Sequence, residues 1–282
     1  MPIDIDKVLG AELPQTRFTW GPDQVILYHL GLGAGVPQID PGELAYTYER
    51  DLKVLPSWGV IPVMASLMSM FSLDGLDINP AMLLHGEQEI EVHGPIPTAA
   101  EASTKATISD LFDKGKGALV ILTTETSVDG ELLFTNRLKA FIRGEGGWGG
   151  EAGPAPKNEA PSRAPDHVFE QPTIPQQALI YRLSGDKNPL HADPAFSAQG
   201  GFEVPILHGL CSYGIACKAV VDGILDGDTA AVATYEARFA GVFFPGETML
   251  IKAWDEGETI LLAAESKQRS AAVISNAAIT RR

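Results

Sequence analysis

The stretch "HGLCSYGIACKAVVDGIL", His208 to Leu225, decides the fold. It is largely apolar around the whole helical turn, with polar side chains mainly at Ser212, Lys218 and Asp222. A helix that lacks a broad polar face must be covered by other structure on most of its surface. We therefore predict a buried central helix whose cover comes from the neighbouring segments.

The segments after this helix have the pattern of strands. Polar and apolar residues alternate along them, and "PG" and "DEG" turn signals separate them. They are "TAAVATYEARFAGVFF", "ETMLIKAW", "ETILLAAESK" and "SAAVISNAAI". The pattern predicts a strongly curved antiparallel sheet, whose concave face covers the helix.

The first half of the chain repeats this order. It has "YHLGLGAG" from Tyr28 and the apolar run "SWGVIPVMASLMSMF" from Ser57, for which we expect a second buried helix. Core packing is the favoured interpretation of Met64, Met68 and Met70 in that run, ahead of an adaptable apolar lining. Four strand patterns follow: "LLHGEQEIEV", "AEASTKATISDLF", "GALVILTTETSV" and "ELLFTNRLKAFI".

A linker separates the two repeats. Ten of the 22 residues 144–165 are Gly or Pro, and no apolar period survives among them. This divides the chain into an N-terminal repeat, residues 1–143, and a C-terminal repeat, residues 166–282. The predicted class is α+β, with two curved antiparallel sheets each wrapped round a central helix, which side by side form one surface.

Composition narrows the function. Of the 282 residues, 45% are hydrophobic and 20% charged, and no apolar run is long enough to span a membrane. The acidic start "MPIDIDKVLG" is unlike a signal peptide and "AITRR" is unlike a peroxisomal "SKL" address, so we expect a cytoplasmic protein. A net charge of -15 argues against a nucleic-acid partner. Cys211 and Cys217 are six residues apart, a spacing that indicates neither a disulfide nor a CxxC pair. We expect both in the core.

The polar stretch "YRLSGDKNPLHADPAF", Tyr181 to Phe196, interrupts the second repeat. Gly185, Asp186 and the Asn188–Pro189 pair are turn formers, so the strand that we predict before them must end there. Asp193 and Pro194 then signal the start of a short helix. The first repeat lacks the acid and the histidine at this place, so we expect one site per chain.

This turn holds Asp186 and His191 where their side chains can converge on one water molecule. A carboxylate and an imidazole that share a water can move its proton. Gly209 starts the buried helix, and its free amide can stabilise a negative oxygen. Each residue alone fits a structural role, an Asx-turn or a packed histidine, but the combination favours catalysis. His208 is expected to be a structural hydrogen-bonding group.

The motif from Tyr181 to Gly209, which ends in "PILHG", resembles that of the R-specific enoyl-CoA hydratases, the hydratase 2 group of MaoC-like hot-dog proteins. The resemblance extends over nearly the whole chain, to the two-repeat form of that group. The further stretches that carry it are "LYHLGLGAG" (27–35), "YERDLKVLPSWGV" (48–60), "LLHGEQEIEVHGPIP" (83–97) and "RFAGVFFPGET" (238–248).

The resemblance implies a double hot-dog fold in which the first repeat accommodates the acyl chain. It implies hydration of a trans-2-enoyl-CoA thioester to the (3R)-hydroxyacyl-CoA, with no metal and no redox cofactor. Asp186 and His191 would hold the water and the Gly209 amide would bind the thioester carbonyl, with Asn188 and Tyr181 in supporting roles. Basic residues near the motif are candidates for the CoA phosphates: Arg182, Lys187, Lys218 and Arg238.

Two other functions stay open at this point. One is a hot-dog acyl-CoA thioesterase, in which the activated water attacks the carbonyl carbon. The other is a non-catalytic acyl-CoA-binding subunit. The acyl chain is not specified by the sequence, and an exposed sheet edge favours a homodimer unless the two repeats already satisfy each other.

Overall fold

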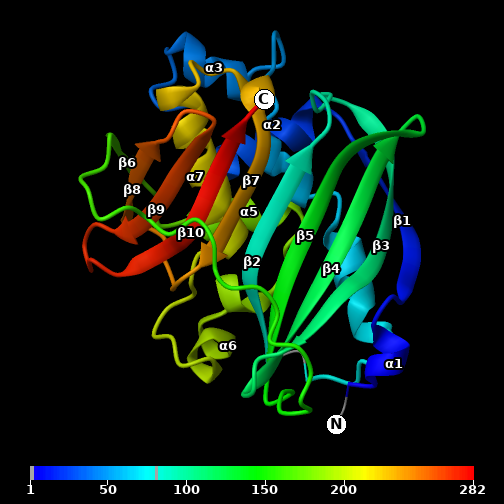
Figure 1. Cartoon of the computed structure of the whole chain (residues 1–282). Helices are drawn as coiled ribbons and strands as arrows, with labels where there is room; N and C mark the ends of the chain where they lie inside the picture. The colour runs from blue at the N-terminus through cyan, green and yellow to red at the C-terminus, as the bar shows by residue number, and fades with distance from the viewer. Residues whose placement is uncertain (1–2, 80–81) are drawn as a thin grey trace.

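A computed structural model describes residues 3–79 and 82–282, and its strands form one continuous antiparallel sheet (Figure 1). The strand order is β1-β3-β4-β5-β2-β7-β10-β9-β8-β6. The first five belong to the N-terminal half: β1 (Glu12–Trp20), β2 (Leu83–Val92), β3 (Ala100–Asp113), β4 (Gly117–Val128) and β5 (Glu131–Arg143). The others are β6 (His167–Pro172), β7 (Val232–Phe239), β8 (Thr248–Asp255), β9 (Thr259–Ser266) and β10 (Ala272–Arg281).

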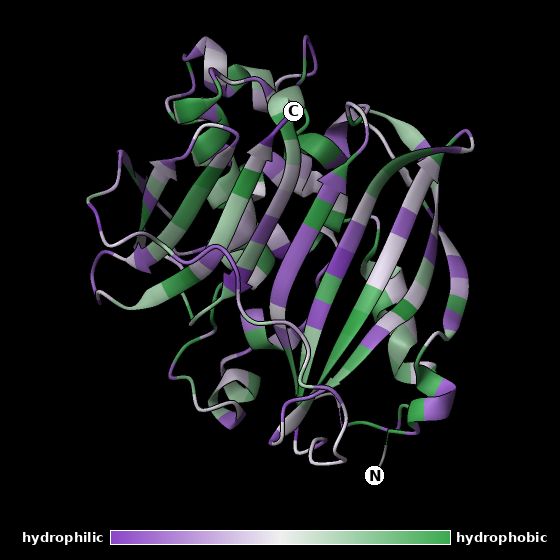
Figure 2. Ribbon diagram, in the orientation of Figure 1, coloured by the Kyte–Doolittle hydropathy of each residue, from purple (hydrophilic) through white to green (hydrophobic). Residues whose placement is uncertain are grey.

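The eight strand patterns that we predicted all form strands, because alternating residues have one apolar face to bury. In β9, Ile260, Leu262 and Ala264 are buried and the residues between them are half-buried. Figure 2 shows hydrophobic and hydrophilic residues alternating along several strands. The buried side chains of both halves join one main apolar core, and a smaller cluster around Met70 and Ile108 lies in the first half.

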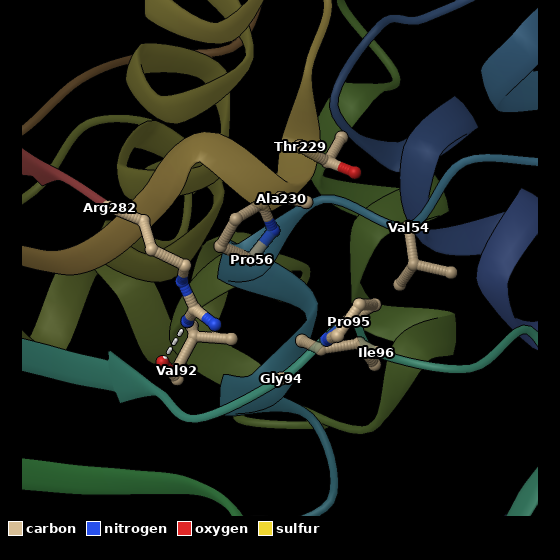
Figure 3. A pocket seen from close by; sticks show the side chains of 9 residues that line it. All are labelled: Val54, Pro56, Val92, Gly94, Pro95, Ile96, Thr229, Ala230 and Arg282. Atoms are coloured by element: carbon tan, nitrogen blue, oxygen red, sulfur yellow. Dashed lines mark hydrogen bonds between the residues drawn. The ribbon is translucent and has the colours of Figure 1, made fainter.

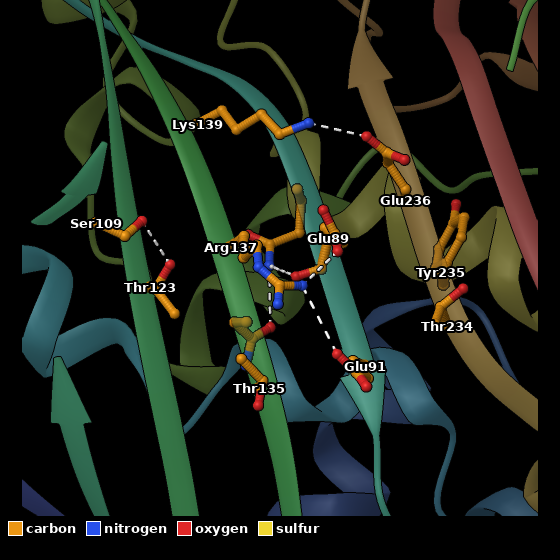
Figure 4. Close-up of polar contacts among 12 residues, drawn as sticks. Glu89, Glu91, Ser109, Thr123, Thr135, Arg137, Lys139, Thr234, Tyr235 and Glu236 are labelled. Carbon is orange, nitrogen blue, oxygen red and sulfur yellow. Dashed lines mark hydrogen bonds and ion pairs between the residues drawn. The ribbon is translucent and has the colours of Figure 1, made fainter. Parts of the chain in front are cut away.

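The strands of the N-terminal half join those of the C-terminal half where β2 pairs with β7. Gln88 lies opposite Ala237 and Ile90 opposite Tyr235 in this antiparallel pair. On the outer face of the seam, Lys139 contacts Glu87 at 2.7 Å and Glu236 at 2.8 Å (Figure 4). An apolar inner face and an ion-paired outer face therefore hold the halves in one sheet.

The long helix α7 (Gly209–Ile224) lies on the inner face of the second half, as we predicted, and twelve of its residues are buried. Shorter helical elements complete the fold. In the first half they are α1 (Ile5–Val8), α2 (Pro22–Gly31), α3 (Pro41–Thr47), η1 (Pro56–Val60), α4 (Met64–Ser69) and η2 (Met70–Ser72). In the second they are α5 (Gln177–Tyr181), η4 (Arg182–Ser184), η5 (Pro189–His191), α6 (Pro194–Gln199) and η6 (Thr229–Ala231).

The second buried helix that we expected from Ser57 is wrong in its form. The run is divided into η1, α4 and η2, because Pro62 has no N–H to donate and interrupts the backbone ladder. Only Met70 of the three methionines is fully buried; Met64 is half-buried and Met68 is 60% exposed. Among the described residues of the first half, the longest helix is α2 with 10 residues, so none matches the 16-residue α7.

The segment between β5 and β6 has no helix or strand and crosses the outer face of the sheet (Figure 1). Asn158 donates to Glu236, and the Arg163 carbonyl accepts from the Trp254 indole N–H at 3.0 Å. A groove of about 420 Å³ remains between this segment and strands β8 to β10. A second cavity, beside Arg282 at the junction of the halves (Figure 3), measures about 10 Å³. It has room for one water molecule.

Candidate active site

The turn that follows α5 presents Asp186 and His191. The stretch before it is helical, not the strand that we predicted, because Ala178 and Tyr181 are buried at helical spacing whereas Leu179 is exposed. A short apolar run does not distinguish the two by itself. Gly185 then takes a φ of +141°, which only glycine adopts without strain, and ends the helical turn.

Side chains inside the turn fix its shape. The Asp186 carboxylate accepts a hydrogen bond from the Asn188 amide at 3.0 Å, and the Asn188 side chain accepts one from the Leu190 amide at 3.0 Å. After His191, Asp193 caps α6 by accepting from the Ala195 amide at 2.8 Å. The predicted turn and helix start are confirmed, and Asn188 shapes the turn as expected.

His191 is held as a neutral imidazole with a defined free nitrogen. Its Nδ1 lies 2.9 Å from the Ile206 carbonyl oxygen, and because a carbonyl only accepts, Nδ1 carries the proton. Nε2 therefore has the lone pair. Burial lowers the pKa of His191, an effect that the Asp186 charge opposes. The ring is suited to accept a proton at neutral pH.

Asp186 and His191 converge, together with His208. One side-chain oxygen or nitrogen atom from each of Asp186, His191 and His208 lies within 4.8 Å of the other two. Two groups at this separation can both contact one water molecule. Asp186 is half-buried and His191 is 8% exposed, so the pair lies at the boundary between solvent and core.

Gly209 is the first residue of α7, so its amide lies in the first turn, where intrahelical partners are missing. Among the described residues it donates no hydrogen bond. A Cβ at this position would lie 3.3 Å from the Phe239 ring, so the glycine permits close packing of α7 on β7. An amide at this position can donate to a bound oxygen, and the role of Gly209 as the oxyanion donor stays a prediction.

His208 and Tyr181 pack beneath the pair. His208 Nε2 donates to the Asp186 main-chain carbonyl at 3.2 Å, which agrees with the structural role predicted for it. The Tyr181 ring is buried, its centroid lies 5.0 Å from that of His208, and its hydroxyl has no hydrogen-bond partner among the residues that the structure describes. Tyr181 therefore supports the site by packing.

The basic residues proposed for CoA separate into two groups. Arg182 is half-buried beside the turn and donates to the Lys187 carbonyl, and the Lys187 side chain is exposed on the turn itself. Lys218 is different: its ammonium lies 2.6 Å from Glu43 and 2.8 Å from Asp222. Arg238 alternates with the buried Ala237 and lies on the outer face of the sheet, away from α7.

Lys218 and Arg238 are therefore withdrawn as candidates for CoA binding. Of the two carboxylates that contact Lys218, Glu43 is distant in sequence and Asp222 lies on the same helix. The face of the sheet on which Arg238 lies depends on the strand register. A sequence motif shows neither the ion pairs of Lys218 nor the face on which Arg238 lies. The two cysteines behave as predicted: Cys211 and Cys217 are both free and buried.

The sequence reasoning missed contacts that the first half makes with the site. Met64 of α4 lies beside Gly185, 3.9 Å from where a Cβ would be, and the Met-rich run was the only signal for it. His85 of β2 stacks edge-on against Phe239, which packs on Gly209, with ring centroids 5.1 Å apart. Both halves thus surround the proposed catalytic residues.

Family models match both halves of the chain. Residues 18–144 match the MFE-2 hydratase 2 N-terminal domain, and residues 156–277 match the MaoC like domain. The fold is that of double hot-dog proteins. It matches a Mycobacterium tuberculosis protein described as a double hotdog, with a TM-score of 0.62 and 14% identity over 98% of this chain and 96% of the other.

Two relatives and a second solved structure define the family more closely. An enoyl-CoA hydratase of Mycobacterium tuberculosis, ChsH3, is 46% identical over 97% of both chains. The peroxisomal enoyl-CoA hydratase 2 of Arabidopsis thaliana is 40% identical over 95% of this chain and 93% of its own. A MaoC-like dehydratase from Phytophthora capsici superposes with a TM-score of 0.87 at 31% identity, covering 99% of each chain. The chain belongs to the two-repeat, MaoC-like enoyl-CoA hydratase 2 family.

The predicted absence of a membrane-spanning helix is confirmed for residues 3–79 and 82–282. None of their helices combines the length and the apolar character that crossing a bilayer requires.

Proposed function

We propose that this protein is an R-specific enoyl-CoA hydratase, which adds water across the 2,3 double bond of a trans-2-enoyl-CoA to give the (3R)-hydroxyacyl-CoA. The observation that carries the proposal is the convergence of Asp186 and His191 with His208, the residue that precedes Gly209 at the start of α7. Membership of the enoyl-CoA hydratase 2 family supports the choice of substrate.

In this reaction one water supplies both new substituents. Its oxygen adds to C3 as its proton passes to the Asp186 and His191 pair, for which the unprotonated Nε2 of His191 provides an acceptor. The pair delivers a proton to C2 on the same face, so hydrogen and charge balance. The negative charge that develops on the thioester oxygen is stabilised by the Gly209 amide. We assign the acid and base roles to the pair as a unit.

The test is incubation of the purified protein with crotonyl-CoA. We expect loss of the conjugated-enoyl absorbance without release of free thiol, and a product of R configuration at C3. Asp186→Asn and His191→Ala should each lower kcat by at least ~100-fold, the usual contribution of a positioned acid or base. Thiol release would favour the thioesterase, and unchanged turnover in folded variants would favour a non-catalytic binding subunit.

We propose that Arg182 and Lys187 contact the phosphates of CoA, since both lie on or beside the catalytic turn. Lys187→Gln should raise KM for crotonyl-CoA by about fivefold, because an exposed ion pair contributes up to ~1 kcal/mol. The matched substrate is the crotonyl thioester of N-acetylcysteamine, which lacks the nucleotide, and its KM should not change. An equal rise in both KM values would contradict the assignment.

We further propose that the first repeat, residues 1–143, accommodates the acyl chain, that residues 144–165 link it to the catalytic repeat, and that residues 166–282 carry the chemistry. The contact of Met64 with the catalytic turn supports this division. Neither of the two cavities described above includes Asp186, His191 or Gly209. A panel of enoyl-CoA chain lengths will identify the preferred acyl group.

No metal or redox cofactor takes part in the proposed reaction. Asp186, His191 and His208 are metal-binding residue types, but the two imidazoles are stacked, with planes 28° apart, so their lone pairs do not converge. We propose a cytoplasmic location, although several relatives, among them the Arabidopsis thaliana hydratase, are named as peroxisomal. A homodimer through the sheet edges β1 or β6 is the oligomer that we propose to test by light scattering.

A further inference from the structure

His208 is a buried histidine to which the proposed reaction gives no role. It is 0% exposed, and its Nδ1 is buried without a hydrogen-bond partner among the described residues. An unpaired buried polar atom costs free energy, whereas a phenylalanine would fill the same space without that cost. The imidazole at this position therefore requires an explanation other than packing.

The first contact of His208 is with His191. The rings of His191 and His208 are stacked, with centroids 3.8 Å apart and planes 28° apart. The hydrogen bond from His191 Nδ1 to the Ile206 carbonyl fixes one edge of the His191 ring. The His208 ring covers one face of the His191 ring. The hydrogen bond and the stacking together restrict rotation of the His191 ring about its Cβ–Cγ bond.

The second contact is with the turn that carries Asp186. Because a carbonyl only accepts, the 3.2 Å hydrogen bond to the Asp186 carbonyl places a proton on Nε2 of His208. This contact joins the start of α7 to the turn between η4 and η5. It fixes the main chain of Asp186, while the Asn188 amide fixes its carboxylate.

The third connection of His208 is through the main chain, to Gly209. His208 is the N-cap of α7, and its carbonyl accepts from the Cys211 and Ser212 amides at 3.1 and 3.2 Å. The peptide bond after it carries the Gly209 amide. One residue therefore touches His191, the main chain of Asp186 and the proposed oxyanion donor.

His208 is also held neutral. Burial, followed by repulsion from a charged His191, lowers the pKa of His208 to about 2, with Arg182 acting in the same direction. The groups that face the two rings are Asp186, Arg182 and the Tyr181 phenol. A second positive charge stacked on His191 would oppose its protonation, so a neutral partner is the one compatible with proton transfer.

We propose that His208 is a positioning residue that keeps the His191 ring, the Asp186 turn and the Gly209 amide in their catalytic arrangement. This inference rests on the proposed function for its kinetic consequence, and on contacts alone for its structural one. His208→Phe retains a flat ring but no donor, His208→Gln retains a donor but no ring, and His208→Ala retains neither.

The kinetic test compares these variants with crotonyl-CoA. His208→Phe should lower kcat by about 10- to 100-fold with KM within about twofold, because misplaced catalytic groups slow the chemical step and not binding. His208→Gln should recover part of that loss through its donor. A His208→Phe variant with wild-type kcat would overturn the role of the hydrogen bond. The matched control His93→Gln, at an exposed histidine of the first half, should keep wild-type kcat.

The second measurement needs no activity. In protein labelled with ¹⁵N at its six histidines, nuclear magnetic resonance reports the tautomer and pKa of His191, assigned by His191→Gln. We expect the Nδ1–H tautomer in the wild type. In His208→Ala, water should reach the ring, raise the His191 pKa towards 6.5 and mix its tautomers. His208→Phe should leave the pKa low.

The two measurements separate the outcomes. If the His191 pKa and tautomer are the same in His208→Ala as in the wild type, the positioning role is wrong whatever the activity. If His208→Ala does not fold, the kcat of His208→Phe relative to the wild type decides. If the wild type hydrates no enoyl-CoA, the proposed function fails and the magnetic resonance result still decides the role of His208.

Discussion

His191 is the residue whose protonation state controls the proposed reaction, because only its neutral form offers Nε2 as an acceptor. Burial lowers its pKa below the ordinary 6.5, so the ring stays neutral to a lower pH than an exposed histidine. We expect kcat/KM for crotonyl-CoA to fall on the acid side with an apparent pKa below 6.5, measured between pH 4.5 and 8 with circular dichroism as the folding control. An acid limb above 6.5 would contradict a buried base.

At the scale of elements, α7 is fixed to the first half by a polar contact at α3. Lys218 lies between Glu43 and Asp222, and the Tyr46 hydroxyl donates to Asp222 at 2.7 Å. Lys218→Met leaves two carboxylates without their cation, and should lower the free energy of unfolding by roughly 2 kcal/mol, less than for a fully buried pair because Asp222 is 35% exposed. Lys187→Met, at an exposed turn, should change it by less than about 0.5 kcal/mol. Urea denaturation measures both.

For the whole molecule, buried neutral histidines make stability depend on pH. Burial lowers the pKa of His29 to about 4 and that of His208 to about 2. Below pH 6.5 the unfolded chain binds protons that the folded protein does not, so stability is full above 6.5 and falls with the pH. At pH 5.5 these two residues should together cost about 3 kcal/mol relative to pH 7.5. Denaturation of His29→Gln at both pH values should show a pH difference smaller than that of the wild type by about 1.4 kcal/mol, and an unchanged difference would contradict the assignment.

The sequence by itself determined the features that rest on local rules. Alternation predicted eight of the ten strands in the described residues but not β1 or β6, an apolar helix pattern predicted α7, and the turn formers around Asp186 with the Asp193 cap predicted the turn at the site. The tertiary structure alone decided which neighbours meet: the stack of His208 on His191, the capture of Lys218 by Glu43, 175 residues away, and the outward face of Arg238. A local pattern fixes backbone conformation because near neighbours determine φ and ψ. Contacts across the sheet depend on register and on how two repeats pack, and no short segment encodes them.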